Sequence, residues 1–349
     1  MHILLINKAL VFGGIETIML TQYKAFKQLG YCVDIVLYSK KVELQLESFE
    51  DIYFVEEYKS LADFVYQRER DAGEYTLIVS HPPSATIVND VRKLQRKESL
   101  FVLHGLYSVK LQNGNFISRY LRKKRLQQRY KDQNIVAVSN AVKNDFLHSV
   151  EVKPAYITTI YNPFDLSLIE QKAALKLQLP TQRDYIVWVG RIQSVKNLPL
   201  LLEIYSYLVD RFDLIIVGDG ERSIKEQMQH YIEQKKLNKN VFFVGTTMNP
   251  YPYIKRAKAL VLTSFNEGLP TVFIESLILK TPIFGVDITP NRELLEQFFK
   301  EGILVGTPQE MAQTILKYRE NSIAYAEVAK RFNSQRCVKE YLSFIQKIT

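Results

Sequence analysis

Short apolar runs alternate with helical stretches along almost the whole chain, and this alternation limits the folds open to it. The first series of runs predicts strands at Ile3–Ile6, Cys32–Leu37, Thr76–Val79, Leu100–Leu103, Ile135–Val138 and Ala155–Ile160. The second series begins at Tyr185 and continues at Leu214–Val217, Val241–Val244, Ala259–Leu262, Thr281–Phe284 and Ile303–Val305. Such runs, separated by helical stretches such as Ile15–Leu29, are typical of β-α-β units around a parallel sheet. The sequence therefore predicts an α/β chain with two parallel sheets.

The two series are separated by the segment Asn162-Pro163-Phe164-Asp165. Proline disfavours helix at the residue before it, so Pro163 suits a domain boundary. A length of 349 residues also favours two domains. We predict one domain over residues 1–164 and a second over residues 165–335. The amphipathic segment 336–349 follows, and a capping box at Thr307-Pro-Gln-Glu310 predicts a helix start within the second domain.

The run from Glu267 to Glu275 combines a strand end, a helix start and two carboxylates. Pro270 favours the first position of a helix, which places Glu267 in the loop ahead of it and Glu275 about one turn inside. The N–H groups and partial positive charge of a helix N-terminus suit a phosphate, and carboxylates on either side can bind hydroxyls. This pattern indicates a nucleotide-sugar site. An ordinary helix start with two unrelated glutamates is the alternative from this window alone.

A second cluster follows the predicted buried strand at residues 185–189. Gly190 allows a sharp turn at the carboxyl end of this strand, and Arg191 and Lys196 come directly after it. Ligands bind at this edge of open parallel sheets. Arginine offers a planar fork to phosphate oxygens and lysine a point charge. We interpret the pair as a diphosphate clamp; two solvated loop cations are the alternative.

Together these motifs resemble the family 4 glycosyltransferases (GT4) of the GT-B fold, of the bacterial surface-polysaccharide type. Each piece is weak alone, but they occur in the family's order and cover nearly the whole chain. The matching pieces are Gly13-Gly14-Ile15-Glu16, Val138-Ser139-Asn140, Asn162-Pro163, Gly190-Arg191, Lys196-Asn197, Val217-Gly218-Asp219-Gly220, Val241-Phe-Phe-Val-Gly245 and the Glu267/Glu275 pair.

The resemblance implies an enzyme with two Rossmann-like domains facing a cleft. Residues 1–164 would form the acceptor domain and residues 165–335 the donor domain, with helix 336–349 returning to the first. The reaction implied is the retaining transfer of a hexose or N-acetylhexosamine from a nucleotide diphosphate sugar, expected to be a UDP-sugar. The expected acceptor is a glycan or lipid-linked sugar in lipopolysaccharide, capsule or another surface polysaccharide.

The resemblance also implies roles for individual residues. The expected catalytic residues are Arg191, Lys196, Glu267 and His104, the last following a strand and contacting the donor sugar. The expected donor-binding residues are Gly13, Gly14, Gly190, Gly218, Gly268, Leu269, Pro270, Thr271 and Glu275. Glu16 and His81 are weaker candidates on the acceptor side, and a structural loop histidine is the alternative for His81 and His104. Around Thr289-Pro-Asn-Arg-Glu293 the family often has further glycines, which leaves sugar contacts there open.

Metal ions and disulfides have little support in this sequence. It has two cysteines and no recognisable cluster of histidine, cysteine and aspartate, so we predict no metal and no cofactor besides the donor. Arg191 and Lys196 would then stabilise the leaving diphosphate. No run of about 18 apolar residues occurs, and the apolar start is read as a strand and not as a signal peptide. We expect a cytoplasmic protein, peripheral on the inner face of the membrane.

The net charge of +9 is concentrated in one short segment. Apolar residues interleave with its cations at helical spacing, which favours docking on an anionic membrane over nucleic acid, for which no motif is present. A solvated basic helix is the alternative. The cations are Arg119, Arg122, Lys123, Lys124, Arg125, Arg129 and Lys131.

Three other functions fit the sequence less well. A dehydrogenase is disfavoured, because Gly13-Gly14 lacks the dinucleotide-binding spacing and no acid ends the second predicted strand. A GT-B sugar-nucleotide epimerase would act on the donor without an acceptor. A non-catalytic sugar-nucleotide-binding protein would neither transfer nor hydrolyse the donor.

Overall fold

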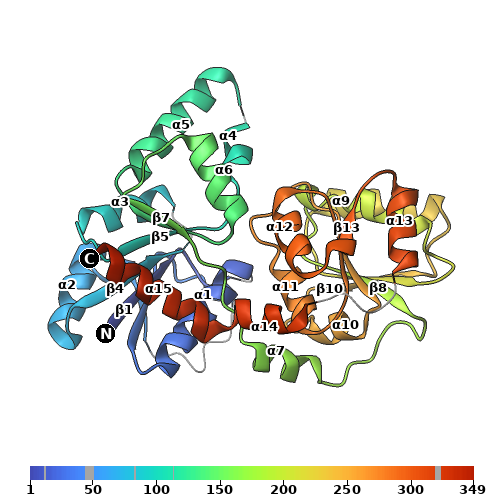
Figure 1. The fold of residues 1–349 in the computed structure, drawn as a ribbon, viewed down its shortest axis with the longest axis horizontal. Coiled ribbons are helices and arrows are strands. Elements are labelled where there is room, and N and C mark those ends of the chain that lie inside the picture. The colour runs from blue at the N-terminus through green and yellow to red at the C-terminus, as the bar shows by residue number, and fades with distance from the viewer. Residues whose placement is uncertain (12, 44–50, 82–83, 113, 319–323) are drawn as a thin grey trace. The chain divides into compact units, whose positions relative to one another are not determined.

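A computed structural model of the chain describes residues 1–11, 13–43, 51–81, 84–112, 114–318 and 324–349. The chain divides into two compact units, Met1–Phe164 with Arg331–Thr349 and Asp165–Lys330 (Figure 1). The predicted boundary after residue 164 coincides with this division. The return to the first unit lies at Arg331, a few residues before the predicted position 336.

Seven parallel strands form the sheet of the first unit within the described residues, in the order β3-β2-β1-β4-β5-β6-β7. They are β1 His2–Asn7, β2 Cys32–Leu37, β3 Ile52–Phe54, β4 Tyr75–Ser80, β5 Ser99–Leu103, β6 Asn134–Ala137 and β7 Tyr156–Thr159. All but β3 were predicted. This strand is short, half-buried and at the sheet edge, so it lacks the apolar run that identifies the others.

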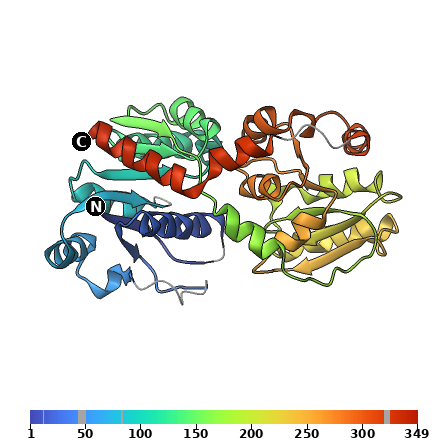
Figure 2. The same cartoon turned by 60° about the horizontal axis from the view of Figure 1, so that its bottom comes forward.

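Helices connect these strands, and they bury the apolar face that their periodicity predicts. They are α1 Gly14–Gln28, η1 Val55–Glu57, α2 Leu61–Ala72, α3 Ala85–Lys93, α4 Tyr107–Gln112, α5 Phe116–Tyr130 and α6 Asn140–Val150. The C-terminal helix α15 Ser334–Ile348 packs against α1 (Figure 2). It buries Cys337, Val338, Tyr341, Leu342 and Ile345. None of the described helices combines the length and apolar character needed to cross a bilayer.

The second unit contains a parallel sheet of six described strands in the order β10-β9-β8-β11-β12-β13. They are β8 Tyr185–Val189, β9 Asp213–Val217, β10 Val241–Gly245, β11 Ala259–Leu262, β12 Ile283–Val286 and β13 Ile303–Leu304. The predicted strand Thr281–Phe284 was misplaced. Thr281 instead lies before β12, directly after Lys280, whose φ is +62°, and the Thr281 hydroxyl donates to the Ile254 carbonyl oxygen.

Helices also connect the strands of this unit, and the two whose starts were predicted, after Pro270 and after Thr307, begin there. The helices are α7 Leu166–Ala173, η2 Ser194–Lys196, α8 Leu198–Ser206, α9 Arg222–Gln234, α10 Tyr251–Arg256, α11 Thr271–Ile278, α12 Thr289–Phe298, η3 Lys300–Gly302 and α13 Pro308–Lys317. The predicted capping box at Thr307 and Glu310 is confirmed. Helix α14 Tyr325–Phe332 carries the chain across the division at Lys330. The prediction of two Rossmann-like α/β sheets is therefore confirmed.

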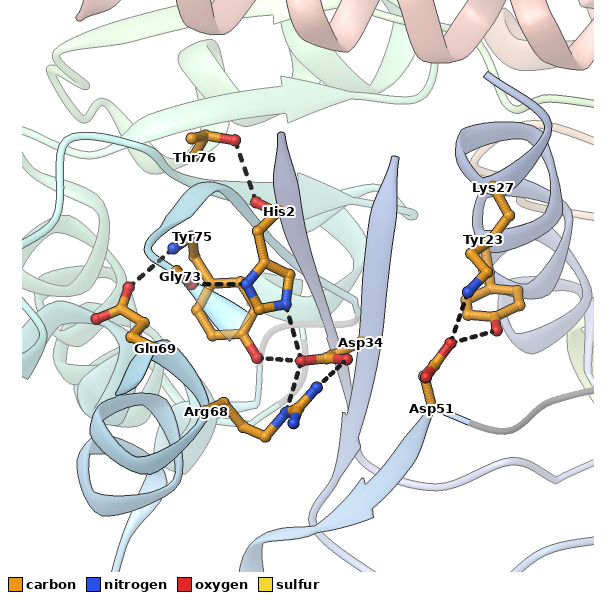
Figure 3. Close-up of polar contacts among 10 residues, drawn as sticks. All are labelled: His2, Tyr23, Lys27, Asp34, Asp51, Arg68, Glu69, Gly73, Tyr75 and Thr76. Atoms are coloured by element: carbon orange, nitrogen blue, oxygen red, sulfur yellow. Dashed lines mark hydrogen bonds and ion pairs between the residues drawn. The ribbon is translucent and has the colours of Figure 1, made fainter. Parts of the chain in front are cut away.

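A buried polar network joins the amino-terminal ends of β1, β2 and β4 in the first unit (Figure 3). Asp34 is fully buried and accepts hydrogen bonds from Arg68, Tyr75 and His2. Both ring nitrogens of His2 face acceptors, since Nδ1 lies 2.7 Å from the Gly73 carbonyl oxygen and Nε2 lies 3.0 Å from Asp34. Arg68 compensates the buried carboxylate, so we assign the network to stability of the sheet.

This network corrects the expectation that no histidine–cysteine–aspartate cluster exists. His2, Cys32 and Asp34 offer potential ligand atoms within 4.8 Å of one another. The sequence hides the cluster because the parallel register of β1 and β2 pairs His2 with Cys32, which comes 30 positions later in the chain. The oxygens of Asp34 already accept hydrogen bonds from Arg68 and Tyr75. The cluster also lies at the amino-terminal ends of the strands, whereas the predicted site residues of this unit follow the carboxyl ends.

Candidate active site

The order of strands reverses once in each sheet, and most of the predicted site residues follow the strands beside that reversal. In the second unit β8 and β11 flank the reversal, and in the first unit β1 and β4 do. Adjacent connections leave the sheet in opposite directions there, which opens a crevice beyond the carboxyl ends of the strands. The loops after β8 and β11 carry Arg191, Lys196 and Glu267, whereas those after β1 and β4 carry Gly13 and His81.

The loop after β8 is held by the loop after β9. Gly218 has a φ of +138°, and a Cβ at this position would overlap the carbonyl oxygen of Gly190. The N–H of Ile192 donates to the Asp219 carbonyl oxygen at 2.9 Å, and the N–H of Glu221 donates to the Ile192 carbonyl oxygen at 2.8 Å. Gly218 was predicted to bind the donor. The observed contacts instead explain why this position is a glycine: the backbones of the two loops pack closely here, and this packing positions Arg191, which is exposed.

Lys196 and Glu267 form an ion pair across the two strand-end loops of the second unit. Lys196 Nζ lies 2.7 Å from Glu267 Oε1, and the side chains are only 23% and 12% exposed. The Thr263 hydroxyl donates to the Asn197 carbonyl oxygen at 2.9 Å, and the Phe265 N–H donates to the Val195 carbonyl oxygen at 2.9 Å. The sequence predicted both charged residues but gave no sign of their pairing. The pair leaves a fixed cation and a fixed carboxylate beside one another.

Helix α11 begins directly after this carboxylate. Its first residue is Thr271, and Pro270 precedes it without a side-chain hydrogen bond to the first turn. The predicted helix start near Pro270 is therefore confirmed. Gly268 and buried Leu269 complete the junction between Glu267 and the helix. Such a helix N-terminus favours an anionic group.

Glu275 lies within α11 and has an unusual ionisation. Burial raises the pKa of its carboxyl to about 7, although a hydrogen bond from Tyr251 opposes the shift. The Tyr251 hydroxyl lies 3.4 Å from Glu275 Oε1, and burial beside that carboxyl raises the pKa of Tyr251. Sequence reasoning missed Tyr251, which is the first residue of α10 and lies in no motif that signals it. The pair gives the site an acceptor whose charge depends on pH near neutrality.

Two pockets of the second unit border these loops. One, of about 370 Å³, includes Asn197, Thr263 and Ser264 and lies beside the Lys196–Glu267 loops. Ser264 Oγ is buried without a hydrogen-bond partner among the described residues. The other pocket, of about 500 Å³, lies beyond β9 and β10 and includes Gly218 and Lys225. The sequence indicated neither pocket, because each is assembled from several strand-end loops.

In the first unit the loop after β1 leads into α1. Gly13 precedes the helix with extended backbone, and Gly14 is its first residue. Glu16 lies in the first turn, and its carboxylate occupies the space that a Cβ at Gly13 would need. The Thr17 hydroxyl donates to the Gly13 carbonyl oxygen at 3.1 Å. Small residues at this turn therefore fit the packing of α1 itself, and their predicted donor contact stays a prediction.

His81 and His104 meet at the carboxyl ends of β4 and β5. His81 Nδ1 lies 2.9 Å from His104 Nε2, so one ring donates to the other. Burial lowers the pKa of His104 to about 3 and lowers the pKa of His81 well below its usual value. Both rings are therefore neutral at physiological pH. Within the described part of the chain, the fully buried Nε2 of His81 has no hydrogen-bond partner.

Comparison with protein-family models gives a match to each half of the chain. The model described as "Glycosyl transferases group 1" matches residues 170–335. The model described as "Glycosyltransferase Family 4" matches residues 12–168.

Curated relatives resemble the chain over about half of their own length. A 4-alpha-N-acetylgalactosaminyltransferase of Campylobacter jejuni, named for its diphospho-undecaprenol-linked substrate, is 27% identical over 210 residues, which cover 58% of this chain and 56% of the relative. The capsular polysaccharide biosynthesis glycosyltransferase CapH of Staphylococcus aureus is 29% identical over 52% of this chain and 51% of its own. A poly(ribitol-phosphate) alpha-N-acetylglucosaminyltransferase of S. aureus is 30% identical over 41% of this chain and 30% of its own.

Solved structures share the fold over almost the full length. Alr3699/HepE of Anabaena, in complex with UDP and glucose, has a TM-score of 0.79 at 18% identity and covers 99% of this chain and 100% of its own. WaaG, a glycosyltransferase involved in lipopolysaccharide biosynthesis, has a TM-score of 0.67 at 13% identity and covers 99% of both chains. At these identities the likeness shows the fold alone.

Proposed function

The chain belongs to the group 1 glycosyl transferases, with an N-terminal half of the glycosyltransferase family 4 type, and on this premise we propose that it moves a sugar from a nucleotide diphosphate sugar to a glycan or lipid-linked acceptor. The observation that carries the proposal is the Lys196–Glu267 ion pair at the start of α11. A cation and a helix N-terminus can stabilise a leaving diphosphate, while the neighbouring carboxylate can bind sugar hydroxyls.

We propose the following division of roles in the donor-binding unit. Arg191 and Lys196 bind the diphosphate, helped by backbone N–H groups at residues 268–271. Glu267 contacts the donor sugar. Glu275 accepts hydrogen bonds from the ribose hydroxyls, which fits a partly buried carboxylate beside the same helix start.

The neutral histidine pair of the first unit fits a hydrogen-bonding role. We propose that His104 contacts the donor sugar as a neutral imidazole, and that His81 orients it through their 2.9 Å contact. Gly13 and Gly14 would admit the donor close to the backbone, and Glu16 would lie toward the acceptor. The reaction would retain anomeric configuration and need no metal ion.

The relatives support a narrower choice of substrates. The names of two of them specify transfer of N-acetylgalactosamine or N-acetylglucosamine, and HepE was solved with UDP. We propose a UDP-linked hexose or N-acetylhexosamine as donor and an intermediate of surface-polysaccharide synthesis as acceptor. A lipid-linked acceptor would place the enzyme at the inner face of the cytoplasmic membrane.

A donor screen followed by a matched set of variants tests the proposal. Nucleotide sugars are screened by thermal shift, since a ligand at about 100 times its Kd adds about 2.7 kcal/mol of stability. With the donor found, Arg191→Ala or Lys196→Ala should each lower turnover by about 100-fold or more. Lys225→Ala is the control, because this lysine of α9 is also paired with a carboxylate, that of Asp219, but has no proposed contact with the donor.

Two results would contradict the assignment. Near-normal turnover in both clamp variants would remove Arg191 and Lys196 from the mechanism. Conversion of the donor to an epimer in the absence of any acceptor would replace transfer by epimerisation.

A further inference from the structure

One face of helix α5 exposes large apolar side chains to solvent. Phe116 is 82% exposed, Ile117 66%, Tyr120 52% and Leu121 47%. Their spacing of one, four and five positions places them on a single face of the helix. Transfer of such side chains out of water lowers the free energy. A cluster of exposed apolar side chains therefore marks an interaction surface. We call these four side chains the apolar stripe.

Helix α5 packs its opposite face into the first unit, so the apolar stripe is not the face that this helix buries in the core. Leu126 and Tyr130 are buried, and the Tyr130 ring packs edge-on against Phe101 and Phe146. Asn115 caps the helix by accepting the Ser118 N–H. Helix α5 also contacts α3, α4 and α6, with which it lies in Figure 1. The helix is therefore anchored along one side and exposed along the other.

Cations continue the exposed surface of the stripe toward the C-terminal end of the helix. Lys124 and Arg125 are exposed, and Lys124 Nζ lies 5.6 Å from the centre of the Tyr120 ring. The helix sequence contains no aspartate or glutamate. Two other cations of the segment are held within the unit: Lys123 lies 2.7 Å from Glu151, and Arg122 donates to the Lys110 carbonyl oxygen. The basic surface is thus narrower than the sequence suggests.

We propose that this face docks on an anionic lipid bilayer by inserting the apolar stripe, with Lys124 and Arg125 bound to lipid phosphates. A helix with apolar side chains beside cations lies in the plane of the membrane interface. A nucleic acid would leave the aliphatic side chains of Ile117 and Leu121 in water, and a second copy would bring two basic helices together. The inference goes beyond the proposed reaction, because docking requires neither donor nor turnover.

Depth of insertion can be read directly from a tryptophan placed in the stripe. The native chain has one tryptophan, Trp188, which is fully buried and gives a constant background. In Phe116→Trp, emission should shift to the blue with vesicles of phosphatidylglycerol and phosphatidylcholine and be quenched by brominated acyl chains. Tyr66→Trp is the control, because Tyr66 is 64% exposed in α2 of the same unit and should show neither change.

Vesicle co-sedimentation separates the apolar contribution from the charges. Phe116→Ser with Ile117→Ser should lower the partition coefficient by about tenfold or more, since two large side chains no longer insert. The matched control is Tyr66→Ser with Leu175→Ser, which removes comparably exposed side chains, 64% and 57%, elsewhere. Binding by the control should match the unmodified protein.

Charge reversal tests the lipid headgroup. Lys124→Glu with Arg125→Glu should lower partitioning by about tenfold or more, and raising salt should weaken binding of the unmodified protein. Arg70→Glu with Lys97→Glu is the control, as both are exposed on the same unit. Equal binding by the stripe variant and its control would overturn the proposal. Protection of Trp at position 116 by RNA alone, or by protein concentration alone, would overturn it in favour of those partners.

Discussion

The ionisation of Glu275 predicts how donor affinity depends on pH. Burial raises the pKa of this carboxyl to about 7. In its proposed ribose-binding role, only the ionised carboxylate can accept hydrogen bonds from both ribose hydroxyls, so donor binding should favour loss of the proton. The ionised fraction rises from about one-eleventh at about pH 6 to about ten-elevenths at about pH 8. Donor affinity should rise about tenfold over this range, or about 1.4 kcal/mol.

Isothermal titration calorimetry with a UDP-sugar measures this change without interference from the ligand. Each phosphate of a UDP-sugar has one ester and one anhydride bond and retains a single strongly acidic group, so the charge on the ligand is constant over the range. Near pH 7 the protein should also release about half a proton per donor bound, which appears as a dependence of the enthalpy on the buffer. The direction follows from the raised pKa, since lower pH favours the protonated, non-binding form.

Glu275→Gln is the matched control, because glutamine keeps an acceptor oxygen and does not titrate. Its affinity for the UDP-sugar should be weaker at high pH and constant from about pH 6 to about pH 8. An equal pH dependence in this variant would assign the proton to another group. A constant affinity in the unmodified protein would refute the role of Glu275 as an ionised ribose acceptor.

Three further outcomes are expected. Transfer should persist in excess EDTA, and loss of activity that magnesium or manganese restores would contradict a metal-independent site. Asp34→Ala should lower the free energy of unfolding in urea titrations by about 3–5 kcal/mol, since it leaves the charge of Arg68 without its buried ion-pair partner. Asp51→Ala removes a more exposed ion pair and should lower it by about 0–1 kcal/mol. Gly218→Ala should lower the free energy of unfolding by more than about 3 kcal/mol or prevent folding, because the added Cβ would overlap backbone atoms. Gly30→Ala should lower it by about 1–2 kcal/mol, because nothing lies within 4 Å of its Cβ and only the positive φ is strained. Equal losses for the two variants in thermal denaturation would contradict the clash at Gly218.

Periodicity was enough to predict most of the fold. A buried parallel strand is a short apolar run, and a helix start has local signals such as Pro270 and Thr307, so both can be identified from neighbouring residues. Strand β3 and the start of β12 were missed because their neighbouring residues do not give these signals. Strand β3 is too short and too exposed to form a run, and Thr281 and Pro282 adjoin the apolar run of β12 in sequence but precede the strand, which begins at Ile283.

Contacts between distant residues could not be predicted from spacing. Three such contacts join side chains that come from different strand ends: the Lys196–Glu267 pair, the His81–His104 pair and the Asp34 network. Strand order and register decide which of these ends are neighbours, and a single sequence does not specify either. The raised pKa of Glu275 belongs to the same class, because it depends on burial and on Tyr251.

The motif around Gly218 shows why a matched motif and the role of its residues are separate questions. The resemblance implied that Gly218 contacts the donor, yet its positive φ and its approach to Gly190 are explained by the protein's own backbone. The hydrogen bonds between Ile192, Asp219 and Glu221 fix the loop that carries Arg191. Glycine at this position therefore supports the loop that carries Arg191, the cation that we propose binds phosphate. A Gly218 variant that folds should accordingly lose diphosphate affinity, even if Gly218 itself never touches the donor.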